Sequence, residues 1–101
     1  MLTSKQRAYL RSLADAEDTI VIIGKGGITE NIIIQMNDAL KARELVKGRV
    51  LDNSLLTARE ASDALSETCR AEVVQVIGSK VVLYKRNEQK PKIELPKTKK
   101  K

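Results

Sequence analysis

The run TIVIIG, residues 19–24, constrains the fold of this chain more than any other segment. It is apolar and rich in β-branched side chains, which is typical of a strand that is covered on both faces or central in a sheet. The sequence KGGITENIII follows at once and predicts a glycine-rich turn, then a helix with Thr29 as its N-cap. A strand that leads directly into a helix predicts a β-α-β unit with parallel strands.

Hydrophobic spacing, caps and turns predict the other elements. The predicted helices cover residues 2–18, 29–44 and 57–72, and the predicted strands cover residues 19–24, 45–51, 72–78 and 80–85. Thr3 and Thr57 each begin a capping box, and Gly78 and Ser79 form a two-residue hairpin between the last two strands. The order α-β-α-β-α-β-β predicts an α/β two-layer sandwich, with helices on a four-stranded mixed sheet.

The core of this domain must be aliphatic, because the chain has two tyrosines, no other aromatic residue and no histidine. Its single cysteine, Cys69, lies on the apolar side of a predicted helix, so we expect a buried thiol without a disulfide, as in the cytoplasm. No metal-ligand cluster or acid–base pair is seen, so we expect no metal, no cofactor and no catalytic residue. No apolar run approaches the roughly 20 residues that cross a bilayer.

The positive charge of the chain is concentrated at its C-terminal end. The net charge is +6; residues 85–101 hold eight Lys or Arg against two Glu, whereas residues 1–84 hold 11 basic and 11 acidic side chains. We therefore predict a folded domain over residues 1–86 and a lysine-rich, disordered tail over residues 87–101. A nucleic-acid site in the domain must be argued from where its own charges lie, since the domain as a whole is neutral.

The glycine-rich turn, Gly24, Lys25, Gly26 and Gly27, is the first candidate site. A loop after such a strand lies at the sheet edge where ligands bind, next to a helix N-terminus. A Walker A loop would need four residues between its glycines and a hydroxyl after the lysine, and a dinucleotide fingerprint would need a small residue in place of Thr29. The remaining alternatives are a solvated tight turn and the G-x-x-G spacing with which KH domains clamp a nucleic-acid backbone.

Basic residues near this turn favour the second alternative. Arg43 lies at the end of the second predicted helix, and Lys47 and Arg49 lie in the strand that follows. Because Lys47 and Arg49 are two residues apart, they project from one face of that strand. A strand face that is merely exposed to solvent would carry the same charges. The basic residues therefore indicate a nucleic-acid site only in combination with the glycine-rich turn.

Three segments, IGKGGIT, ELVKGRVL and VVQVIGSKVVLYKR, occur in this order and resemble the YhbY-like proteins, the stand-alone bacterial form of the CRM domain. The resemblance covers residues 2–86. It implies a fold similar to the C-terminal domain of translation initiation factor 3, with a KH-like G-x-x-G loop. It also implies RNA binding and association with precursors of the large (50S) ribosomal subunit. The family often has His where Arg43 stands, and a basic end of the first helix where Glu17 and its neighbours are acidic.

We therefore predict a cytoplasmic, monomeric RNA-binding protein without catalytic activity, which binds ribosomal RNA or pre-50S particles. The predicted RNA-binding residues are Gly24, Lys25, Gly26, Gly27, Arg43, Lys47 and Arg49. The alternative is a protein-docking module of the ribosome or its precursors, whose tail binds polyanions without specificity.

Overall fold

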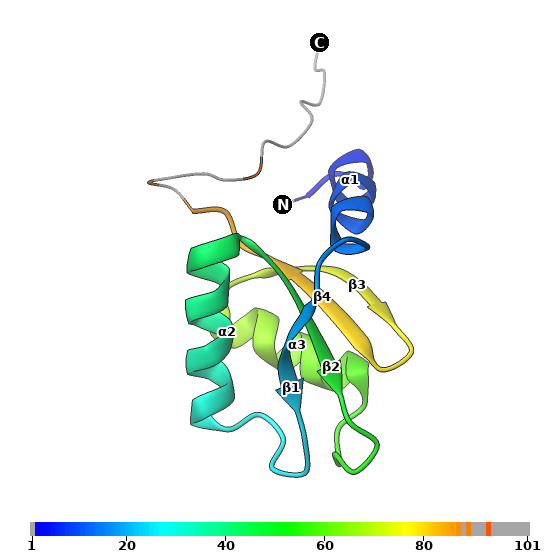
Figure 1. The fold of residues 1–101 in the computed structure, drawn as a ribbon, viewed down its shortest axis with the longest axis vertical. Coiled ribbons are helices and arrows are strands. Elements are labelled where there is room, and N and C mark those ends of the chain that lie inside the picture. The colour runs from blue at the N-terminus through cyan, green and yellow to red at the C-terminus, as the bar shows by residue number, and fades with distance from the viewer. Residues whose placement is uncertain (1, 88, 90–92, 94–101) are drawn as a thin grey trace.

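The computed structural model describes residues 2–87, 89 and 93. Over these residues, helices and strands follow one another in the predicted order (Figure 1). They are α1 (Ser4–Ala14), β1 (Thr19–Ile23), α2 (Glu30–Arg43), β2 (Leu45–Val50), α3 (Ala58–Cys69), β3 (Glu72–Ile77) and β4 (Lys80–Tyr84). The predicted α/β class with a four-stranded mixed sheet is confirmed.

The strand order of the sheet is β1-β2-β4-β3. β1 pairs in parallel with β2, as predicted, and β4 lies antiparallel between β2 and β3. The prediction that β1 is central or covered on both faces is wrong, because β1 is an edge strand whose Ile22 is 45% exposed. Its run of apolar residues has another cause: a register shift after Thr19 places Ile20, together with Val21 and Ile23, against one core.

The helices cover the two faces of the sheet unequally. α2 and α3 pack against one face and enclose the larger core, in which Met36, Leu40 and Leu65 are buried. α1 lies on the other face, over a smaller cluster that contains Leu10 and Tyr84 (Figure 1). It covers only the end of the sheet where β2 begins and β4 ends. We call the rest of that face the open face; the strand register places on it the side chains of Ile22, Lys47, Arg49, Gln75, Ile77 and Lys80.

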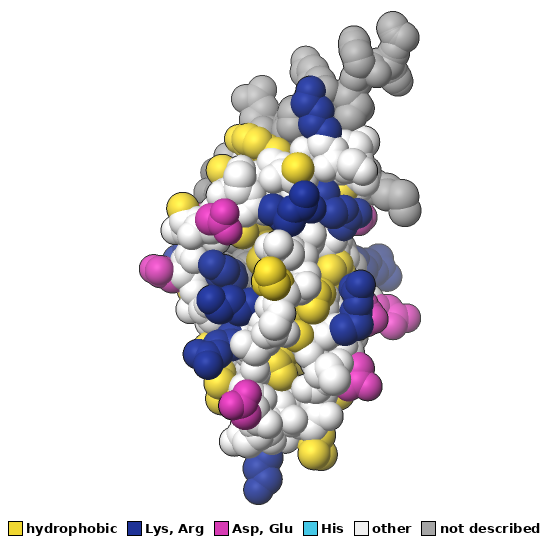
Figure 2. Space-filling view, turned by 90° about the vertical axis from the view of Figure 1, so that its right-hand side faces the viewer, with side chains coloured by type: hydrophobic (Ala, Val, Ile, Leu, Met, Phe, Trp, Pro, Cys, Tyr) yellow, Lys and Arg dark blue, Asp and Glu magenta, His cyan; other side chains and the backbone are white. Residues whose placement is uncertain are grey.

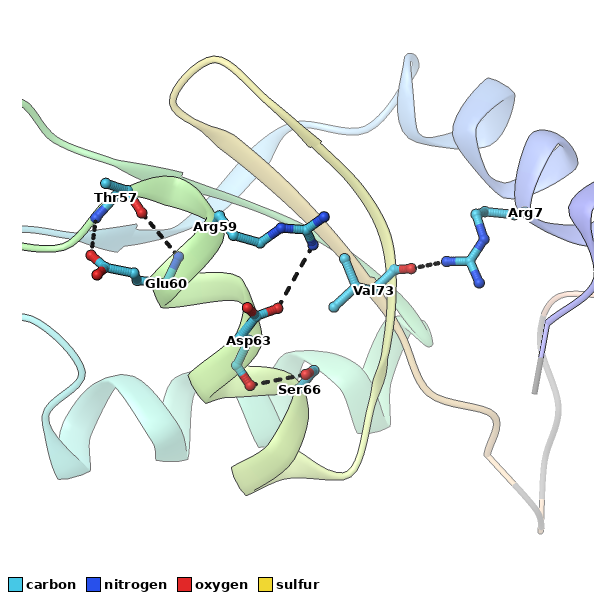
Figure 3. Close-up of polar contacts among 7 residues, drawn as sticks. All are labelled: Arg7, Thr57, Arg59, Glu60, Asp63, Ser66 and Val73. Atoms are coloured by element: carbon cyan, nitrogen blue, oxygen red, sulfur yellow. Dashed lines mark hydrogen bonds and ion pairs between the residues drawn. The ribbon is translucent and has the colours of Figure 1, made fainter.

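Arg7 attaches α1 to the edge strand β3. Its guanidinium group donates a hydrogen bond to the carbonyl oxygen of Val73 (Figure 3). The register of β3 against β4 shifts between Val73 and Gln75, so this strand is irregular at the point where α1 meets it. Arg7 therefore has a structural contact that holds α1 on the sheet.

The starts of the helices confirm the predictions from the sequence. Thr3 with Gln6, and Thr57 with Glu60, form complete capping boxes, the second of which is drawn in Figure 3. The side chain of Thr29 accepts a hydrogen bond at the start of α2. These interactions satisfy backbone N–H groups that the first helical turn cannot pair.

Two glycines are required by the geometry of the sheet. Gly78, with φ of 58°, begins the predicted hairpin between β3 and β4. Gly48 lies in the middle of β2, where a Cβ atom would be 3.2 Å from the carbonyl oxygen of Val21 and 3.2 Å from Cγ2 of Val81. A side chain at position 48 would therefore force these neighbours to shift by a few tenths of an ångström.

Arg70 ends α3 in the left-handed conformation, with φ 57° and ψ 45°. This conformation costs a residue with a Cβ atom roughly 1–2 kcal/mol. Glycine avoids this cost, but part of the gain is offset because glycine loses more conformational entropy on folding. We expect Arg70→Gly to raise the free energy of unfolding by about 0.5–1 kcal/mol, measured by urea denaturation. Arg70→Ala is the matched control and should leave stability close to that of the wild type. Equal stabilities of the two variants would contradict this account.

Candidate nucleic-acid interface

The glycine-rich turn lies between β1 and α2, at the end of the sheet opposite to α1 (Figure 1). The N–H of Gly27 donates to the carbonyl oxygen of Gly24 at 3.0 Å, which closes the turn around Lys25 and Gly26. Gly27 has φ of 72°, a conformation that favours glycine. Lys25 and Gly26 are exposed, so a charged side chain and bare backbone are both accessible to a ligand.

The loop between β2 and α3 lies beside this turn. A Cβ atom on Gly24 would be 3.7 Å from Cδ1 of Leu51, and one on Gly27 would be 3.7 Å from Cδ1 of Leu56. Leu55, in the same loop, is 92% exposed. This end of the molecule therefore presents an accessible cation, accessible backbone and an exposed apolar side chain.

Lys47 and Arg49 both lie on the open face, as their spacing predicts. Arg49 is paired with Ile22 of β1 and with Lys80 of β4, and Lys80 is paired with Ile77 of β3. These four residues form a row across the sheet, which we call the cationic row. The isoleucines at its ends are 45% and 59% exposed. Figure 2, turned so that the right-hand side of Figure 1 faces the viewer, shows one group of Lys and Arg side chains at the left and others across the upper part and at the right.

In the free protein, the two cations at the centre of the cationic row repel each other. Arg49 and Lys80 are direct partners in an antiparallel ladder, so their side chains leave the same face about 5 Å apart. Like charges in such positions destabilise a sheet. A bound anion would remove this repulsion, so the pair is suited to contact a polyanion.

Arg43 lies at the far end of the molecule from the glycine turn. Its Nη1 is 3.4 Å from Oε1 of Glu17, in the segment between α1 and β1. Nζ of Lys47 donates to the carbonyl oxygen of Glu17, also at 3.4 Å. α2 has 14 residues and is therefore about 20 Å long, so Arg43 and Lys25 are too far apart to bind one phosphate. The structure brings Lys47 and Arg49 together and places Arg43 apart from the turn.

Lys80 is not among the predicted site residues. The pairing of Lys80 with Ile77 could have been predicted from the sequence, because the two residues flank the two-residue hairpin. Its position beside Arg49 requires β4 to insert between β2 and β3, and no local pattern specifies that order. Lys80 therefore extends the candidate interface from β2 onto β4.

Other kinds of site find little support in the described residues. Cys69 is 2% exposed in the larger core, as predicted. Burial raises the pKa of its thiol, and Lys85 acts weakly in the opposite direction, so the thiol stays protonated at neutral pH. Within the described part of the chain, no group of three His, Cys, Asp or Glu side chains could hold a metal ion. None of the described helices is both long enough and apolar enough to cross a membrane.

A small α/β domain with an accessible glycine turn and opposed cations on an uncovered sheet face has the features of a polyanion-binding domain. Comparison with known families makes this class specific. Residues 2–85 match the model of the CRS1 / YhbY (CRM) domain, so the chain belongs to this family, as its motifs predict.

Relatives of known name and structure agree with this assignment. The chain is 44% identical over 96 residues to the Bacillus subtilis protein named "Probable RNA-binding protein YqeI", over 95% of this chain and 100% of the relative. It is 34% identical over 95 residues to a Haemophilus influenzae protein named "RNA-binding protein", over 94% and 95% of the two chains. The solution structure of the hypothetical protein SAV1595 from Staphylococcus aureus, whose description proposes RNA binding, superposes with a TM-score of 0.80 at 52% identity, over 95% and 100%.

Proposed function

We propose that this protein is a cytoplasmic, monomeric RNA-binding module without catalytic activity, and that its target is ribosomal RNA in precursors of the 50S subunit. The names of the relatives support RNA as the ligand. The observation that carries the proposal is the pairing of Arg49 with Lys80. Two cations that lie directly opposite each other on an uncovered sheet face repel each other, and a bound anion relieves this repulsion.

In this proposal, the open face binds phosphate groups. Lys47 and Arg49 are two residues apart on β2, so their side chains emerge about 6.7 Å apart, and Lys80 lies on the adjacent strand. The cationic row contains no acidic residue that would neutralise Arg49 and Lys80, and Lys47, next to the row, donates a hydrogen bond to the backbone carbonyl oxygen of Glu17. Three cations in this arrangement can therefore contact successive phosphates of one RNA strand.

The glycine turn makes the second contact with the RNA backbone. Backbone N–H groups at the start of α2 and the ammonium group of Lys25 both favour an anion near residues 24–27. Neither the turn nor the open face carries an aromatic side chain on which bases could stack. We expect recognition of RNA shape and backbone to dominate over the reading of base sequence. Arg43 contributes at the far end of α2, once it leaves Glu17.

The salt dependence of RNA binding tests this proposal. Fluorescence anisotropy with a structured fragment of large-subunit ribosomal RNA gives the slope of log affinity against log salt concentration. Removing one phosphate contact should reduce this slope by about 0.7–0.9, so we expect that decrease for Lys25→Ala and roughly twice that decrease for the double variant Lys47→Ala, Arg49→Ala.

Arg59→Ala is the control for this measurement, because Arg59 is an exposed cation on α3, on the other side of the sheet, next to Asp63 (Figure 3). We expect it to leave the slope unchanged. Wild-type affinity and slope in the turn and strand variants would contradict the proposal. Association with pre-50S particles that resists both ribonuclease and these substitutions would favour the protein-docking alternative, for which the exposed Ile22 and Ile77 offer an apolar surface.

A further inference from the structure

A pocket of about 550 Å³ lies beside the C-terminal end of α2, far from the glycine turn. Its volume is within the range of sites that hold small molecules, which is roughly 300–1,000 Å³. The buried side chain of Leu40 contributes to its lining, together with Asn37, Lys41, Lys85, Arg86, Asn87 and Gln89. The proposed phosphate contacts of the open face and the turn use none of these residues.

The pocket is strongly cationic. Lys41, Lys85 and Arg86 line it, and none of the lining residues that the structure describes is acidic. The C-terminus of α2 contributes about half a negative charge, and the buried carboxylate of Glu44 lies next to the lining residue Asn87, so the three cations still leave a net positive charge. The lining also includes the amides of Asn37 and Gln89, a type of side chain that can both donate and accept hydrogen bonds. This combination suits a ligand with an anionic group and a polar, planar group.

One side of the pocket is a segment that follows β4 and is held in place by Glu44. The N–H of Lys85 donates to the carbonyl oxygen of Glu44 at 2.9 Å. The N–H of Asn87 donates to the Glu44 carboxylate at 2.6 Å, and its side-chain amide donates to the carbonyl oxygen of Lys41 at 3.3 Å. These bonds connect the segment to the end of α2 on the other side of the pocket.

The anchoring group itself is unusual, because Glu44 is 0% exposed. Burying a carboxylate costs several kcal/mol unless hydrogen bonds compensate for the lost water. Here the carboxylate accepts from the backbone N–H groups of Asn87 and Ile93, so it holds these two residues beside the end of α2. At least one lining residue of the pocket, Asn87, is therefore held in place by a buried group.

We propose that this pocket binds a nucleoside phosphate, either free or as one nucleotide of an RNA strand. The phosphate lies among Lys41, Lys85 and Arg86, and the base lies within reach of Asn37 and Gln89. The inference goes beyond the proposed function, because this site lies about the length of α2, roughly 20 Å, from the glycine turn.

The test is a titration of the full chain followed by ¹⁵N–¹H NMR, with the four nucleoside monophosphates, inorganic phosphate and a short single-stranded RNA as probes. We expect the amide signals of residues 37–41 and 85–89 to shift in a saturable way. The double variant Lys41→Ala, Arg86→Ala should weaken this binding at least tenfold, because both side chains are exposed and their removal leaves the fold intact. Arg59→Ala is the matched control, since Arg59 lies outside both proposed sites, and it should bind as the wild type does.

Each outcome decides the proposal. Saturation by monophosphates identifies a free nucleotide as the ligand, and saturation by RNA alone identifies a nucleotide within a strand. Equal binding of inorganic phosphate and of nucleotides, unchanged binding by the pocket variant, or shifts spread over all surface cations would overturn it. Loss of RNA binding in the Lys47→Ala, Arg49→Ala variant with an unchanged monophosphate titration of the pocket would support both proposals, because it would show that the two sites bind independently.

Discussion

Lys80→Glu is expected to weaken RNA binding on the order of 100-fold at low salt while making the free protein more stable. The substitution removes one phosphate contact and places a carboxylate opposite Arg49, which neutralises a second cation of the cationic row. The same change turns a repulsive cross-strand pair into an attractive one, which should add about 0.5–1 kcal/mol to the free energy of unfolding. Opposite effects on stability and on binding are the signature of charges that are placed for a ligand.

Anisotropy at low salt and urea denaturation measure the two effects. Lys5→Glu is the matched control, since it makes the same change of net charge at an exposed position of α1. We expect Lys5→Glu to reduce affinity far less than Lys80→Glu. Lys80→Gln should give intermediate values of both quantities. Equal losses of affinity in the two glutamate variants would reduce the effect to net charge, and a less stable Lys80→Glu protein would show that the row has no electrostatic strain.

Glu44→Ala is expected to lower the free energy of unfolding by about 2–3 kcal/mol and to release the segment after β4. The carboxylate accepts hydrogen bonds from the backbone N–H groups of Asn87 at 2.6 Å and of Ile93 at 2.7 Å. A hydrogen bond to a charged acceptor contributes roughly 1.5–3 kcal/mol, and part of this total offsets the burial of the charge. Alanine would leave both N–H groups without this acceptor.

Urea denaturation gives the stability, and amide hydrogen exchange at Asn87 and Ile93 reports release of the segment. Glu44 has φ of 65°, so Glu44→Gly separates the effect of backbone strain from that of the carboxylate. We expect the glycine variant to recover only part of the loss, because it relieves strain without restoring the acceptor. Full recovery in Glu44→Gly, or protected amides at both positions in Glu44→Ala, would contradict the role of the carboxylate.

Local patterns in the sequence predicted the elements because their causes are local. The caps at Thr3, Thr29 and Thr57 and the hairpin at Gly78 each depend on a few neighbouring residues. The same patterns could not place β1 at the edge of the sheet, nor α1 on the face opposite α2 and α3, because both depend on contacts between distant segments. An apolar stripe on a helix shows that the helix packs against a core. It does not show which face of the sheet the helix covers.

The residues of the candidate site also fall into those that a local pattern predicts and those that contacts between distant segments place. A spacing of two predicted that Lys47 and Arg49 share a face, which the register confirms. Arg43 is close to both in sequence, yet the helix axis carries it away from the glycine turn and toward Glu17. Lys80 joins the row only through the strand order. Nothing nearby in the sequence singles out Glu44 or indicates that residues after β4 contact its carboxylate.

The predicted domain boundary at residue 86 also rests on local composition, which carries no information about contacts with distant residues. The segment after β4 contacts the domain at Asn87 and Ile93, through the carboxylate of Glu44. The predicted disorder of the tail otherwise concerns residues that lie outside the described ones.

The smaller cluster beneath α1 links the two ends of the chain. Leu2, just before α1, and Ile93, after β4, both pack against the residues around Leu10 and Tyr84. Because a few side chains serve both ends, loosening one end withdraws apolar contacts from the other. The effects of Leu2→Ala and Ile93→Ala on the free energy of unfolding are therefore expected to be non-additive, because both side chains contact one cluster.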